Sequence, residues 1–170
     1  MSTLLEKPIK VNKIVTTSVE QARAIEDPAR AKIMELLYRR SLSAEQISNE
    51  LKRTGYKKAL TTVRHHLEIL KNSELIQIVK IEESRGAITK YYGTATKLLG
   101  YRAPDDFDSK YSKIIENTST KVEKILKNIL PKTTKEKKGK ITDPEHYSQY
   151  LIMEIMNRAM TSVLENPENK

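Results

Sequence analysis

The sequence predicts a mainly α-helical fold with a small β-wing, a winged helix-turn-helix domain followed by C-terminal helices. Between residues 60 and 72, Val63, Leu67 and Leu70 recur at spacings of four and three, the period of one buried helix face. An apolar run with strand character follows at once, over residues 75–81. A helix with a polar, cationic N-terminal face that leads directly into a strand is typical of the second helix of a winged helix-turn-helix.

Local signals predict three helices before this one. Ser18 with Gln21, and Ser43 with Gln46, have the spacing of a capping box, in which each residue caps a backbone N–H near the helix start. The dipeptide Asp27–Pro28 places a capping aspartate before a proline that suits the first helical position. We therefore expect helices that begin near residues 18, 27 and 44.

A hairpin and two long helices are expected after residue 74. Arg85–Gly86 lies between two β-rich runs and reads as a hairpin tip. The predicted organisation is an N-terminal arm (1–17), a winged helix-turn-helix domain (18–95), a connector (96–107) and a C-terminal helical dimerisation region (108–165) with a basic linker at 131–141.

The two C-terminal helices carry long apolar stripes. In residues 108–130 an a/d-type seam steps by four, three, four, three and four residues, with one polar interruption at Thr118. We expect these helices to form or extend a homodimer interface, and packing of the two helices on each other is the alternative. The dimerisation candidates are Tyr111, Ile115, Val122, Ile125, Ile129, Leu151, Ile155, Met156 and Met160.

The charge balance favours a polyanionic partner. The chain holds 31 Lys and Arg against 22 Asp and Glu, for a formal charge of +9, which favours nucleic acid first and an anionic membrane surface second. No acidic residue occurs between Leu51 and Leu67, in the stretch that contains the exposed helix face. No apolar run of 18 residues and no signal peptide is present, so we expect a cytoplasmic, nucleoid-associated protein that does not enter membranes.

Several residue types around this helix suit contacts with double-stranded DNA. Arg64 can form two hydrogen bonds to the O6 and N7 atoms of guanine, whereas Lys57 and Lys58 would contact phosphates. Arg85, at the tip of the wing, would enter a minor groove. The candidate DNA-binding residues are Lys52, Arg53, Lys57, Lys58, Thr61, Thr62, Arg64, His65, Arg85 and Lys90.

Catalytic and metal chemistry find little support in the sequence. The absence of cysteine excludes disulfides, thiolate metal sites and cysteine nucleophiles. No phosphate-cradling glycine loop, nucleophile elbow or HExxH motif occurs. His65 and His66 are adjacent and would point to different faces of a helix, so we expect no metal site there and assign His66 to packing. We expect no catalytic residue and no cofactor.

Residues 18–95 resemble the ArsR-type winged helix-turn-helix regulators, especially archaeal members. The resemblance lies in Asp27–Arg30, Ser43–Ile47, Thr62–Leu67 and the wing segment Lys90–Tyr92. It implies a dimeric DNA-binding transcription regulator, and many such proteins are repressors released by metals. Two features depart from that family: no cysteine is available for a thiolate sensor, and the turn between Leu51 and Thr62 is longer than usual.

The sequence therefore predicts a homodimeric, sequence-specific DNA-binding transcription regulator, a repressor, with no assigned effector. One alternative is a sequence-tolerant architectural chromatin protein that uses the same surface. A second alternative is a winged-helix protein–protein interaction module, in which the basic face is incidental.

Overall fold

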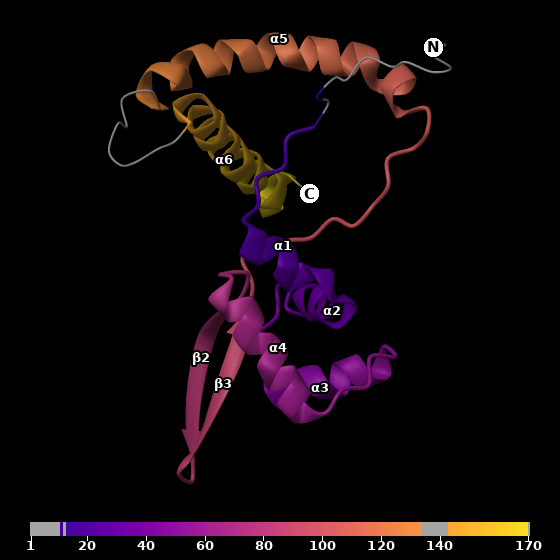
Figure 1. The fold of residues 1–170 in the computed structure, drawn as a ribbon, viewed down its shortest axis with the longest axis vertical. Coiled ribbons are helices and arrows are strands. Elements are labelled where there is room, and N and C mark those ends of the chain that lie inside the picture. Colours follow the sequence, from indigo (N-terminus) through magenta and orange to yellow (C-terminus); the bar gives the residue numbers. More distant parts are fainter. Residues whose placement is uncertain (1–10, 12, 134–142, 170) are drawn as a thin grey trace, which may run out of the picture. The chain divides into compact units, whose positions relative to one another are not determined.

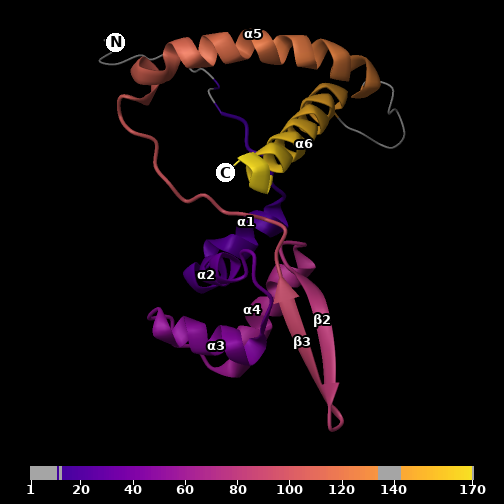
Figure 2. The same cartoon turned by 180° about the vertical axis from the view of Figure 1, so that it is seen from behind.

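The structure, a computed structural model, describes residues 11, 13–133 and 143–169. The chain divides into two compact units. One spans Thr17–Tyr101, and the other contains Arg102 and the described residues after it, together with those before Thr17. Figures 1 and 2 show both units from opposite sides.

Four helices form most of the first unit. They are α1 (Val19–Glu26), α2 (Pro28–Leu36), α3 (Ala44–Arg53) and α4 (Leu60–Asn72). Both predicted capping boxes are present, at the starts of α1 and α3. The Asp27 carboxylate accepts hydrogen bonds from the first backbone N–H groups of α2, at 2.8 and 3.2 Å. The predicted starts of these helices are therefore confirmed.

A three-stranded antiparallel sheet completes this unit, in the order β1-β3-β2. The strands are β1 (Leu42–Ser43), β2 (Gln77–Ser84) and β3 (Ala87–Gly93). Arg85 and Gly86 connect β2 to β3 in a two-residue turn, with φ angles of 51° and 78°. Two left-handed residues match the right-handed twist of a hairpin, which accounts for glycine at the second position. This wing is the long magenta hairpin in Figure 1, and the predicted fold class is confirmed.

Two strand boundaries differ from the sequence prediction. The first wing strand runs to Ser84 rather than ending at Ile81, because pairing with β3 continues to the turn. Leu42 and Ser43, which the sequence suggested only as a break between helices, pair with Tyr92 and Tyr91 of β3.

The core of the first unit fixes the orientation of α4. The apolar face predicted for α4 is completely buried, since Val63, Leu67 and Leu70 have no exposed surface. Ile47 and Leu51 on α3 are equally inaccessible. Because helix faces packed in this way cannot rotate without opening cavities, the opposite face of α4 is held toward solvent.

The second unit consists of α5 (Phe107–Thr133), α6 (Pro144–Glu165) and a short 3-10 helix (Pro167–Asn169). The two long helices are in contact with each other. α5 continues through Pro131, past the predicted start of the basic linker, and the Thr133 hydroxyl donates to the Leu130 carbonyl at 3.1 Å. The rest of the predicted linker, residues 134–141, lies outside the described residues. No helix among the described residues has the length and apolarity that a membrane span requires.

Candidate nucleic-acid interface

The N-terminal half of α4 presents polar side chains to solvent. Thr61, Arg64 and His65 are exposed, and Thr62 is half-buried. The sequence candidates outside α4 are also exposed: Lys52, Arg53, Lys57, Lys58, Arg85 and Lys90. None of these side chains is needed to fill the core, so all of them are accessible to a ligand.

The turn between α3 and α4 is ordered by hydrogen bonds to backbone carbonyls near the end of α3. The Tyr56 N–H donates to the Leu51 carbonyl at 2.8 Å, and the Thr54 hydroxyl donates to the Glu50 carbonyl at 3.1 Å. Gly55 has a φ of 87°, a conformation that a side chain would strain. The additional residues of this long turn thereby place Lys57 and Lys58 directly before the first turn of α4.

The start of α4 is suited to negative charge. Its N-cap residue, Ala59, provides no side-chain hydrogen bond, and its first turn contains no acidic residue. The first backbone N–H groups of a helix carry partial positive charge and attract anions. Together with Lys57 and Lys58, this helix start favours contact with phosphates.

Arg64 forms an ion pair that joins α4 to α3. Its Nη2 atom lies 2.8 Å from Oε1 of Glu45, a residue in the first turn of α3. Both side chains are more than half exposed, at 58% and 53%. Arg64, the candidate for base recognition, thus has a specific partner in Glu45. The sequence did not predict this pair, because the two residues are 19 positions apart.

His66 is buried between α4 and α2. It is 6% exposed, and its Nδ1 atom lies 3.5 Å from Nη1 of Arg30. Since a guanidinium can only donate, Nδ1 must accept and the ring proton must sit on Nε2. Among the described residues Nε2 has no hydrogen-bond partner. The assignment of His66 to packing agrees with this burial.

Acidification is expected to destabilise the fold through His66. Burial lowers the pKa of His66, Asp27 opposes this effect, and Arg30, Lys58 and His65 reinforce it. The unfolded chain therefore takes up this proton before the folded chain does, so stability is complete above about pH 6.5, the ordinary histidine pKa, and falls as the pH drops below it. Urea unfolding between pH 7.5 and 5 should show this loss.

His66→Gln removes the titrating group and should flatten that pH dependence, whatever its effect on stability at neutral pH. His65→Gln, one position away on the exposed face of α4, is the matched control and should change the slope far less, because His65 is the smallest of the influences on the pKa of His66. Parallel pH profiles for the natural chain and His66→Gln would contradict the role assigned to His66.

The wing carries its own ion pair. Lys80 and Glu82 on β2 are paired, and Nζ of Lys80 lies 5.1 Å from the centre of the Tyr91 ring. Hydrogen bonds from Lys80 and Tyr91 lower the pKa of Glu82. Lys80 was not predicted as a candidate, and its charge is already partnered, whereas Arg85 extends from the turn beyond it.

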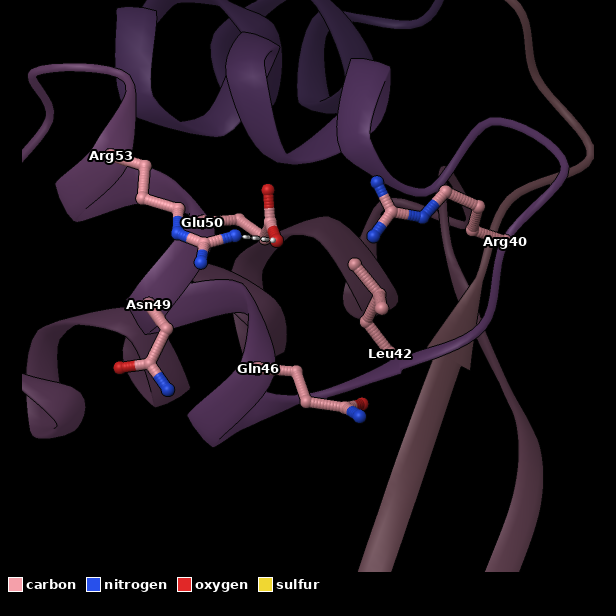
Figure 3. Close-up of a pocket in the computed structure, with 6 residues that line it drawn as sticks. All are labelled: Arg40, Leu42, Gln46, Asn49, Glu50 and Arg53. Carbon is pink, nitrogen blue, oxygen red and sulfur yellow. Dashed lines mark hydrogen bonds and ion pairs between the residues drawn. The ribbon is translucent and has the colours of Figure 1, made fainter.

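A polar hollow lies on the outer side of α3. Figure 3 shows Arg40 and Arg53 on opposite sides of Glu50, and only Arg53 pairs with that carboxylate, at 3.5 Å. Sequence reasoning identified Arg53 but missed Arg40, because only the folding of the α2–β1 turn brings the two together. The lining residues are Arg40, Leu42, Gln46, Asn49, Glu50 and Arg53.

The predicted dimerisation residues lie on a C-terminal unit that buries very little. α6 has no buried residue, and Thr133 is the single buried residue of α5. Ile115, Ile125, Ile155 and Met160 are 42–54% exposed. The remaining candidates are partly buried: Tyr111, Val122, Ile129, Leu151 and Met156.

In the described part of the chain, no group of three or more His, Cys, Asp or Glu side chains could hold a metal ion. His146, the third histidine, pairs instead with Asp143 at 2.6 Å at the start of α6.

Comparisons with known proteins place residues 27–77 in context. This segment, from the start of α2 to the start of β2, matches the family model described as "Bacterial regulatory protein, arsR family". The crystal structure of NolR from Sinorhizobium fredii is similar at 15% sequence identity, covering 57% of this chain and 79% of that one, with a TM-score of 0.36. No curated protein matches the chain, and the archaeal likeness expected from the sequence has no support here.

Proposed function

We propose that this chain, whose residues 27–77 match the arsR-family model, is a sequence-specific DNA-binding transcription regulator that acts as a homodimer. The observation that carries the proposal is the two-sided character of α4. One face of α4 is buried in the core through Val63, Leu67 and Leu70. The other face presents Arg64 and neighbouring polar residues to solvent, and the first acidic residue of α4 is Glu68. A major groove of B-DNA admits one such helix.

The two kinds of candidate contact would have separate roles. Lys57 and Lys58, at the start of α4, would neutralise phosphates and set the position of the domain without reading sequence. Arg64, one turn into the helix, would recognise a guanine edge through paired hydrogen bonds. Arg85 at the wing tip would reach the adjacent minor groove.

Arg64→Ala is expected to weaken binding to the preferred site by about 1–3 kcal/mol and binding to random duplexes much less. The alanine variant removes the base contact, whereas phosphate contacts elsewhere remain. Mobility-shift titrations on both duplexes measure the difference, and Arg64→Lys is the control that keeps the charge but loses the planar fork. Equal losses on both duplexes would reduce Arg64 to a backbone contact and favour a sequence-tolerant architectural protein.

Lys57→Ala combined with Lys58→Ala should reduce the salt dependence of DNA binding. Each phosphate contact contributes about −0.9 to the slope of log K against log[salt]. Removal of both lysines should therefore flatten the slope by about one to two units. Lys121→Ala, on α5, is a control of the same residue type. An unchanged slope in the double variant would exclude these lysines from the interface.

Two features support the proposed homodimer: the geometry of DNA binding and the exposed apolar surface of the C-terminal unit. Two reading helices must lie about 34 Å apart, one DNA turn, to enter successive major grooves. A single winged helix has one reading helix, so a second copy is required. The apolar side chains left exposed on α5 and α6 are the surface that we assign to this contact, because exposed patches of this kind mark interaction sites.

Repression is the mode of action that we propose. A dimer fixed on an operator excludes other proteins from that DNA, and this requires no further domain. A reporter gene placed downstream of the selected operator tests the proposal in cells that express the chain. Transcription should fall on expression and recover with Arg64→Ala, and a rise in transcription would identify an activator.

A further inference from the structure

We infer that Glu45 is a positioning residue for Arg64 and thereby a determinant of base specificity. The carboxylate holds the guanidinium in one orientation on the exposed face of α4 and directs it toward base edges rather than phosphates. This inference rests on the proposed DNA-binding function. It assigns a role to a residue of α3 that lies outside the reading helix.

Glu45 is itself held in place. It occupies the first turn of α3, two residues after the N-cap Ser43. The backbone N–H of Glu45 lowers the pKa of its carboxyl most, burial raises that pKa, and Arg64 and Ser43 lower it further, so that the net shift is downward. The carboxylate also lies at the positive end of the α3 dipole. An ionised carboxylate on the first turn of a packed helix therefore offers Arg64 a partner at a defined position.

The contact with Arg64 leaves the guanidinium able to bind DNA. The hydrogen bond of 2.8 Å involves Nη2, and a guanidinium has five N–H bonds in a planar fork. Among the described residues, the Arg64 guanidinium makes no other hydrogen bond. A second N–H pair therefore remains for a guanine edge while the bond to Glu45 persists.

Two physical effects connect Glu45 to specificity. A free arginine loses rotamer freedom when it binds, and an arginine that is already held loses less. The carboxylate also repels phosphate oxygens, whereas the edge of a guanine is uncharged and is not repelled to the same degree. Both effects favour the base contact over a phosphate contact by the same guanidinium.

The test begins with duplexes selected from a random pool by the natural chain. Affinities are then measured for two duplexes. One is the preferred site, and the other is the same site changed at one base pair, the pair for which Arg64→Ala loses its preference. Glu45→Gln should reduce the ratio of these two affinities by about 3–10-fold, the range of a weakened base contact. Affinity for random duplexes should stay the same or rise.

Three controls restrict the interpretation. Glu50→Gln makes the same charge change on the same helix, at a carboxylate paired with Arg53, and should leave the ratio unchanged. Adding Glu45→Gln to Arg64→Ala should have no further effect on the ratio, because Glu45 acts through Arg64. Thermal unfolding should show that Glu45→Gln is as stable as the natural chain to within a few degrees, since the ion pair is exposed.

An unchanged affinity ratio in Glu45→Gln would overturn the inference. If that unchanged ratio came with an equal increase in affinity for all duplexes, Glu45 would be a simple competitor of DNA for Arg64. If the natural chain shows no sequence preference, the proposed function fails. If Arg64→Ala loses a preference that Glu45→Gln retains, only the inference about Glu45 fails.

Discussion

Replacement of Ile115 and Ile125 with glutamate is expected to convert the homodimer into monomers. Binding to an operator with two half-sites should then weaken by about 10²–10⁴-fold, because this is the gain in affinity that linking two binding modules provides. Both side chains lie on α5 and are 46% exposed in the chain by itself. Glutamate is therefore compatible with folding of the single chain. In a dimer that buries this surface, four unpaired carboxylates would be desolvated.

Sedimentation equilibrium and mobility shifts on the same operator measure the two effects. Lys113→Glu is the matched control, since it also lowers the charge by two units and lies on an exposed position of the same helix, on the face opposite the predicted seam. The control should remain dimeric and should bind the operator far more tightly than the double variant. A double variant that stays dimeric with full operator affinity would locate the interface outside this part of α5.

Leu67→Ala is expected to lower the free energy of unfolding by about 2–5 kcal/mol, the range for truncating a fully buried leucine. Leu67 has no exposed surface and lies in the middle of α4, within the core shared by all four helices of its unit. A small domain has a total stability of about 5–15 kcal/mol, so this loss is a large part of the total and should lower the temperature at which the domain unfolds.

Urea unfolding followed by circular dichroism measures the loss. His65→Ala, on the exposed face of the same helix, is the control and should change stability by less than about 0.5 kcal/mol. DNA binding by Leu67→Ala should weaken as temperature rises, in parallel with its unfolding. A loss below about 1 kcal/mol would show that α4 is not anchored through this residue.

Local signals were sufficient to predict most of the fold. The capping boxes of α1 and α3 lie within four residues of sequence, and the hairpin tip needs only Arg85–Gly86. The buried residues of α4 recur every three or four positions, so one or two helical turns of sequence are enough to recognise the buried face. Each of these features depends on neighbours in sequence, which is why the sequence alone identifies it.

Features that depend on distant residues could not be predicted in the same way. β1 has two residues and no periodicity, and exists only because it pairs with β3, about 50 residues later. The bond between Arg30 and His66 joins residues 36 apart. The Glu45–Arg64 pair joins two exposed charges that have no sequence pattern in common, so only the packing of α3 against α4 reveals it.

Pro131 shows the limit of a local rule. The basic composition of residues 131–141, which contain almost no apolar residue, predicted a linker from Pro131 onward. Proline also lacks a backbone N–H and usually ends a helix. α5 nevertheless continues to Thr133. A proline in the last turn removes only one hydrogen bond, and the Thr133 hydroxyl supplies another to the Leu130 carbonyl.

Selection of DNA by the chain from a random duplex pool shows directly whether α4 reads a base sequence. We expect enrichment of one sequence, with two inverted half-sites centred about one DNA turn apart. Affinity for this site at physiological salt should exceed affinity for its scrambled version by a factor of at least about 10³. Failure to enrich any sequence, or equal affinity for the selected and scrambled duplexes, would contradict the assignment of α4 as a sequence-reading helix.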